Sequence, residues 1–396
     1  MTTLQTPSDH PPPPVLQGRE QLLAGLPYLL GYRPERSVVL VGSWVDELQP
    51  AVGGRNRLPL AVTVRIDLPD RPDRAGAVMA EVADPLDRAI RERRTARGAV
   101  ARPGPAMLTH LFILDADDEL AASVLRAARV LLGEVGAPVH EALLVRGGIY
   151  LPLVSAGETD PPVGGGWDAE QGEVGTWTGP LRHRPTDWLA TPSAHEVQAV
   201  ADWVLQGRSP HGTREDVVER VRQRDEHAAG ETARALARAR RPAAAPGVED
   251  GLAWLGSAAR GAQLRASQRA GVVLALEDRE VRDLVLARWI PELFDGHAAT
   301  DWPLAELLGH VEPLPPGRSG PIQHLLNLSA QLPEEQSVPL LTLVGALAWW
   351  EGEGTVANEV IDLCLERDPG YRLALLLDTA LRHGLSPRAL AARAAA

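Results

Sequence analysis

Acidic side chains follow two apolar runs in the first half of the chain. Asp67 ends the alternating run 60–67, and Asp115 follows the apolar run 107–114, with Asp117 just beyond it. If both runs are strands joined by a helical crossover, their carboxyl ends meet at one edge of a sheet, where open α/β folds bind ligands. Carboxylate oxygens are the ligands that Mg²⁺ prefers. The spacing therefore predicts a ligand site there, with Asp67, Asp115 and Asp117 as possible metal ligands.

Two arginines near the same strand ends, Arg65 and Arg146, are candidate counter-charges for a polar ligand. A structural alternative competes with this site. Asp117 or Asp118 caps the following helix and Asp115 simply ends its strand, as acidic residues at helix starts commonly do. We favour the capping role and keep the Mg²⁺ site as the alternative.

The basic residues exclude several classes of enzyme. The chain has no lysine, so all 40 basic residues are arginine. A P-loop, a pyridoxal Schiff base and a protein kinase each need a lysine. The single cysteine, Cys364, rules out an intramolecular disulfide and a cysteine-rich metal centre, and its position in an apolar run favours a buried hydrophobic role. No other cofactor is predicted.

The net charge of −12 opposes binding to nucleic acid or to an anionic membrane. The N-terminal residues lack the basic and then apolar order of a signal peptide. The longest apolar run, residues 338–350, is too short to span a bilayer. We expect a cytoplasmic protein whose partners are other polypeptides or further copies of the chain.

The first half alternates strand and helix patterns. This order predicts an α/β domain with a mixed, partly parallel sheet, in which the first two strands form a hairpin. Strands are predicted at 37–42, 60–67, 107–114 and 140–154, the last turning at Gly147-Gly148, and helices are predicted at 21–31, 74–97 and 118–135.

The composition changes after residue 154, where Gly, Pro and Trp become frequent. Beyond residue 191 the pattern is helical to the end, with a charged piece at 213–241 that we expect to be an exposed helical arm or pair. The predicted organisation is a disordered tail (1–17), an α/β domain (18–154), a connector (155–191) and an all-α, helical-hairpin domain (192–396).

The last sixty residues contain two helix-to-helix turns in close succession. Gly352 and Gly354 interrupt the pattern after the run 338–350, and Asp368-Pro369-Gly370 precedes a third run. Glycine at a helix end and proline near a helix start are typical of such turns. The hairpin stack resembles a tetratricopeptide unit, a surface that binds polypeptides. Trp349, Trp350 and Tyr371 are the candidate partner-binding residues, although a core position is favoured for the two tryptophans.

Residues 22–41, LLAGLPYLLGYRPERSVVLV, together with Arg65-Ile66-Asp67-Leu68-Pro69, resemble the opening of the actinobacterial domain-of-unknown-function family 4192. The C-terminal segments WEGEG (350–354) and DPGYRLA (368–374) resemble its closing pattern. Members commonly carry a cysteine-rich stretch after the last strand of the first domain, and this chain has no sulfur there. The resemblance implies no assigned reaction.

These observations favour a non-enzymatic interaction or scaffold protein that uses its C-terminal helical stack. The rival hypothesis is a small-molecule or metal-dependent enzyme, or a ligand sensor, with its site at the carboxyl edge of the sheet. A third hypothesis is an obligate homo-oligomer.

Overall fold

The computed structural model describes residues 18–45, 60–96, 105–154, 187–192, 197, 200–201, 204, 210, 212–241, 246–293, 305–314 and 320–382. The chain divides into two compact units. The α/β unit comprises Val15–Pro27 and Pro34–Val200, and the helical unit comprises Met1–Pro14, Tyr28–Arg33 and Ala201–Ala396. The predicted tail and most of the predicted connector lie outside the described residues.

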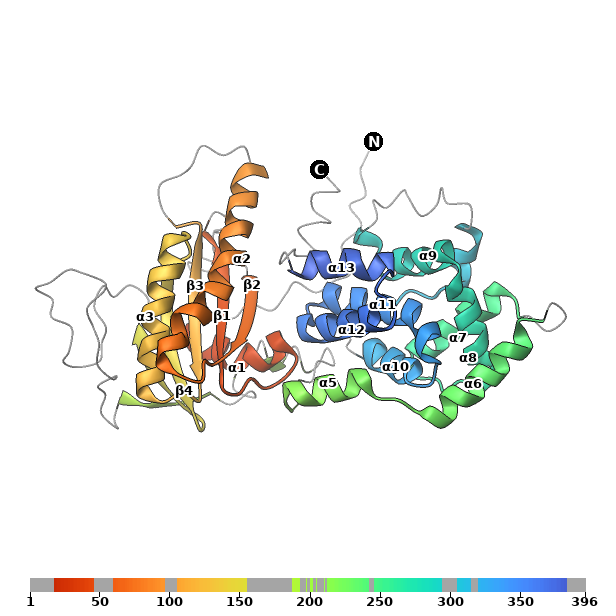
Figure 1. The fold of residues 1–396 in the computed structure, drawn as a ribbon, viewed down its shortest axis with the longest axis horizontal. Coiled ribbons are helices and arrows are strands. Elements are labelled where there is room, and N and C mark those ends of the chain that lie inside the picture. The colour runs from red at the N-terminus through yellow and green to blue at the C-terminus, as the bar shows by residue number, and fades with distance from the viewer. Residues whose placement is uncertain are drawn as a thin grey trace, which may run out of the picture. The chain divides into compact units, whose positions relative to one another are not determined.

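The α/β unit is built on a mixed sheet with the strand order β2-β1-β3-β4-β5-β6 (Figure 1). Its only parallel pair among the described strands is β3 with β4. The predicted mixed, partly parallel sheet is therefore confirmed. The strands are β1 (Ser37–Trp44), β2 (Leu60–Asp67), β3 (Met107–Leu114), β4 (Val139–Arg146), β5 (Ile149–Val154) and β6 (Leu189–Ala190).

The strand β1 lies between β2 and β3 and pairs antiparallel with both of them. Consequently β2 and β3 run in the same direction without touching. The hairpin between β4 and β5 turns at Gly147 and Gly148, whose φ angles of 50° and 84° suit glycine in a two-residue turn.

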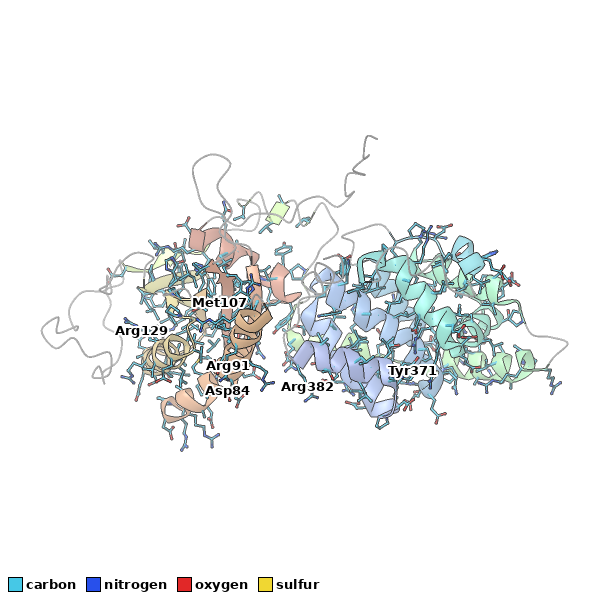
Figure 2. The ribbon with its side chains drawn as sticks, turned by 90° about the horizontal axis from the view of Figure 1, so that it is seen from above. Asp84, Arg91, Met107, Arg129, Tyr371 and Arg382 are labelled. Atoms are coloured by element: carbon cyan, nitrogen blue, oxygen red, sulfur yellow. The ribbon has the colours of Figure 1, made fainter. Side chains whose placement is uncertain are left out.

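The helices α2 (Ala75–Ala96) and α3 (Asp118–Glu134) cover one face of the sheet. A short 3₁₀ turn, η2 (Pro72–Arg74), precedes α2. Figure 2 labels Asp84 and Arg91 on α2 and Arg129 on α3, with both helices on the same side of the strands. Alternate strand residues, including Leu40, Leu111 and Leu144, pack against the apolar stripes of these helices. The opposite face carries α1 (Gly18–Leu30), whose polar ties to the sheet are described below.

From residue 212 onward, the described part of the helical unit consists of helices that pack closely on one another. The helices are α5 (Arg214–Arg222), α6 (Glu226–Ala239), α7 (Val248–Ala259), α8 (Ala266–Glu277), α9 (Arg279–Trp289), α10 (Gly320–Ser329), α11 (Glu334–Glu351), α12 (Gly354–Arg367) and α13 (Arg372–Arg382), with 3₁₀ turns η6 (Pro291–Leu293) and η7 (Ala305–His310). The piece 213–241 is thus a pair of helices. It is not an exposed arm, because α6 packs on α8 and α5 packs on α12.

A buried arginine joins several helices of this unit. Arg269 of α8, only 5% exposed, donates hydrogen bonds to the Thr232 hydroxyl at 2.7 Å, the Leu264 carbonyl at 2.7 Å and the Gln331 side chain at 3.0 Å. The burial of the Arg269 charge is tolerated because its N–H donors have hydrogen-bond acceptors. This network links α6, α8 and the turn after α10.

The last three described helices form the predicted hairpin stack, in which α11 packs on α12 and α13 packs on both. The helix α11 ends at Gly352, which has a φ of 82° and so provides the left-handed cap. None of the helices in the described ranges combines the length and the hydropathy needed to span a bilayer.

Candidate functional site

The carboxyl edge of the sheet holds the first set of predicted site residues. Ser37, the first residue of β1, pairs with Asp67 on β2 and with Leu114 on β3, so Asp67 and Asp115 emerge at the same edge. The strand β1 lies between them, which separates their backbones by about 10 Å, or two strand spacings. The two acids share an edge without being neighbours.

Each of these carboxylates has a protein partner. Asp67, with its side chain 71% exposed, pairs with Arg65 at 2.5 Å. Asp115 accepts from the Arg36 backbone N–H at 3.3 Å. Asp117 is the N-cap of α3, where Oδ1 accepts from the Leu120 N–H at 2.8 Å.

Arg146 also has protein partners. Its Nη2 donates to Asp118 at 2.7 Å, its Nε donates to the Ala116 carbonyl, and its guanidinium lies 5.4 Å from the Trp188 ring. The structure therefore brings Arg146 to the start of α3 rather than to Asp67. Among the described residues, no group of three or more His, Cys, Asp or Glu side chains is placed to share a metal ion.

Two buried polar atoms near this edge have no hydrogen-bond partner in the described part of the chain, Ser37 Oγ and Arg65 Nε. Ser37 is fully buried, and the Arg65 side chain is 14% exposed. The pairings Ser37–Asp67 and Val39–Arg65 place both side chains on the face opposite α2 and α3. The Ser37 hydroxyl and the Arg65 Nε–H can each donate a hydrogen bond. Their common position on this face follows from the strand register and cannot be seen in the sequence alone.

The predicted partner-binding residues lie at different depths in the helical stack. Trp349 of α11 is buried, with 8% of its surface exposed, and the next residue, Trp350, is half-buried. Tyr371 precedes α13, and its hydroxyl accepts from Arg282 Nη1 at 2.6 Å while the same guanidinium lies 5.4 Å from the ring. Figure 2 labels Tyr371 and Arg382 at the two ends of α13.

The outward face of α13 carries apolar residues that the sequence analysis did not single out. Ala374, Leu377 and Ala380 are buried against the stack. Leu375 and Leu376, by contrast, are 44% and 59% exposed. The run Leu375-Leu376-Leu377 places leucines on more than one face of the helix, so the three cannot all lie in one buried stripe.

Acidic side chains flank this outward face. Asp378 of α13 pairs with Arg382 at 2.7 Å. The pKa of Asp362 on α12 is raised by burial and then by the neighbouring Glu359 and Asp378 carboxylates. The Asp362 carboxylate therefore lies near those of Glu359 and Asp378, and Arg382 offsets part of their charge.

The face of the sheet opposite α2 and α3 holds a polar group that the sequence analysis also missed. The Glu141 side chain, 6% exposed, contacts His110 Nδ1 at 3.2 Å and Arg19 Nε at 3.1 Å. A histidine inside the apolar strand β3 and a glutamate in β4 are visible signals in the sequence. Their meeting depends on the β3–β4 register, which pairs His110 with Glu141.

Comparison with known proteins gives one match. The sequence profile of the family described as a domain of unknown function (DUF4192) matches residues 20–388. No curated protein matches the chain, and no solved structure matches it. Because the match spans both compact units, the chain belongs to the DUF4192 family, a domain of unknown function.

Proposed function

We propose that this chain is a non-enzymatic, cytoplasmic interaction protein that binds a polypeptide through the outward face of α13. The observation that carries the proposal is the adjacent pair Leu375 and Leu376, exposed on a helix whose other face is packed. Exposing two neighbouring large apolar side chains to water costs free energy that a docked partner recovers.

The charges beside α13 support a particular partner chemistry. The carboxylates of Asp362 on α12 and Asp378 on α13 lie beside this helix and favour cationic groups in a partner. A helix that lays an apolar stripe into a groove is a common mode of recognition. We therefore propose a partner segment with apolar anchors for Leu375 and Leu376 and with basic residues beside those anchors.

The test is quantitative affinity purification from the native host, followed by mass spectrometry. The variant Leu375→Glu/Leu376→Glu places two charges on the outward face, and we expect it to recover the specific partner at least about tenfold less well, which corresponds to about 1.4 kcal/mol. Val130→Glu is the matched control, because Val130 is an apolar residue of α3 that is 42% exposed.

Equal recovery of every co-purifying protein by the wild type and the double variant would refute the proposal. Light scattering on the purified proteins covers the self-association alternative. A wild-type oligomer that the double variant loses and Val130→Glu retains identifies the partner as a second copy of the chain.

A second candidate function, favoured by Ser37 and Arg65, is small-molecule binding at the carboxyl edge of the sheet. Their unmet atoms are hydrogen-bond donors, so they suit a ligand with acceptor oxygens, such as a carboxylate or phosphate. Mg²⁺ binding would instead require Asp67, Asp115 and Asp117 to leave the partners described above.

A thermal-shift screen of metals, nucleotides and carboxylic acids tests this second candidate. A shift that Arg65→Gln removes supports an acceptor ligand at this edge. Calorimetric titration of Mg²⁺ separates the metal alternative, because Asp67→Asn/Asp115→Asn must then lower the binding heat. Heats unchanged by this double substitution exclude a Mg²⁺ site at these two acids.

A further inference from the structure

The polar group around Glu141 connects the first turn of α1 to the sheet. Glu141 accepts from Arg19 Nε at 3.1 Å through Oε1 and contacts His110 Nδ1 at 3.2 Å through Oε2. Arg19 is in α1 and His110 is in β3, so the carboxylate lies between a helix and a neighbouring strand. A carboxylate as buried as this one is stable only while both its oxygens are hydrogen-bonded.

A second histidine joins this group because the β3–β4 pairing is irregular. Thr109 pairs with Val139 and His110 pairs with Glu141, which leaves His140 as an extra residue in β4. Such a bulge re-aims side chains. The His140 ring accordingly lies edge-on to His110, with 5.7 Å between the ring centroids.

A separate hydrogen bond fastens the next residue of α1. The Tyr150 hydroxyl of β5 donates to Glu20 Oε1 at 3.1 Å. Consecutive residues of one helix turn therefore contact two different strands. The titratable and charged groups that these contacts bring together are Arg19, Glu20, His110, His140, Glu141 and Tyr150.

Protonation of His140 is disfavoured in the folded protein. The pKa of His140 is lowered from its ordinary value of 6.5 by burial and then by His110, while Glu141 opposes the shift. A depressed histidine pKa means that the folded state favours the neutral ring. The associated stability is present above pH 6.5 and is lost as the pH falls through the depressed value.

We propose that the first turn of α1 is an acid-sensitive clasp on the sheet, closed by the Arg19–Glu141 ion pair and opened when His140 is protonated. Glu141 attracts the protonated His140 ring, which then competes with Arg19 for the single carboxylate charge. Of the two groups that contact Glu141, Arg19 is the more exposed, with 32% of its side chain exposed against 20% for His110, and so is the one that leaves. The apolar residues of α1, including Leu22 and Leu26, remain buried and limit the opening to the first turn.

Hydrogen exchange on the full chain tests the clasp. The backbone amides of residues 22–24 bond to the carbonyls of residues 18–20 in an α-helix, so their protection reports the first turn. We expect their protection factors, corrected for intrinsic exchange, to fall about tenfold or more as the pH is lowered from about 7.5 through the depressed pKa of His140. Amides of α11 serve as the internal reference for global loosening.

Two variants make the outcome decisive. His140→Gln keeps a polar side chain without the proton, so we expect it to hold the protection at the lower pH. Arg19→Gln removes the ion pair, so we expect it to show the open level already at the higher pH. The same acid-induced fall in His140→Gln as in the wild type, or wild-type protection in Arg19→Gln, would overturn the proposal.

Discussion

The carboxyl edge of the sheet and the outward face of α13 are two candidate sites in the described part of the chain, and they differ in whether their side chains already have partners within the protein. At the edge, Asp67, Asp115 and Asp117 each have a protein partner. On α13, Leu375 and Leu376 project into water beside a buried face. A charged residue at a strand end is therefore a weaker sign of a site than an apolar residue left exposed.

The physical reason is that polar groups find partners locally, whereas apolar groups need area. An aspartate at the start of a helix meets backbone N–H groups that have no other partner. A leucine on the outward face of a helix has no such local partner, because it becomes buried only when another element covers it. This contrast is the reason why we propose that a partner binds the helical unit.

The largest expected effect concerns the packing beneath α13. Cys364 on α12 is fully buried, and burial raises the pKa of its thiol. Only the thiolate reacts, so we expect modification by a maleimide at neutral pH to be slower in the native protein than in the denatured chain by at least about 10³-fold, since the stack must open first. The measurement is the rate of mass gain.

Rapid labelling of native Cys364 would break the comparison, because it would mean that the stack supporting α13 is open. The same measurement on Leu375→Glu/Leu376→Glu is a check on its folding. That variant should label as slowly as the wild type.

The second prediction contrasts the two faces of α13 directly. Leu377 is 7% exposed and Leu376 is 59% exposed. Leu377→Ala should lower the free energy of unfolding by about 2–4 kcal/mol, through lost burial and a cavity. Leu376→Ala should change it by less than about 0.5 kcal/mol. Denaturant unfolding measures both, and equal effects would show that the two leucines share one environment.

A smaller effect is expected at the sheet edge. Asp117→Ala removes the N-cap of α3 and should lower the free energy of unfolding by about 1 kcal/mol. The exposed pair of Asp67 with Arg65 is weaker, so Asp67→Ala should change it by less than about 0.5 kcal/mol. Thermal unfolding of both variants is the measurement. The reverse order would mean that Asp67 does more at this edge than pair with Arg65.

Much of the fold follows from local patterns. The alternation of 60–67 and the apolar run 107–114 coincide with β2 and β3 residue for residue. Gly147, Gly148 and Gly352 mark turns because their positive φ angles suit a residue without a Cβ. These features depend on sterics within a few residues, which a single sequence contains.

The strand order was less accessible. The prediction paired β1 with β2, which the structure confirms, but the local pattern contains nothing that inserts β1 between β2 and β3. The candidate sites depend on that order. Pairings between distant segments set the spacing of about 10 Å between the backbones of Asp67 and Asp115. They also bring His110 into contact with Glu141.

The exposed leucines of α13 illustrate a different limit. Hydrophobic periodicity correctly predicts that α13 is amphipathic, and Ala374, Leu377 and Ala380 form its buried stripe. Leu375 and Leu376 lie outside that stripe. Whether such flanking residues are covered depends on the neighbouring helices, and the structure was needed to show it.

Site-specific photo-crosslinking tests the proposed surface most directly. A photoreactive amino acid at position 376, on the outward face of α13, should crosslink a specific polypeptide in the native host, while the same amino acid at position 130 on α3 should not. The crosslinked segment should contain apolar residues flanked by basic ones. Absence of a crosslink at 376 under conditions that preserve slow labelling of Cys364, or the same products from both positions, would contradict the proposal that the helical unit binds its partner through α13.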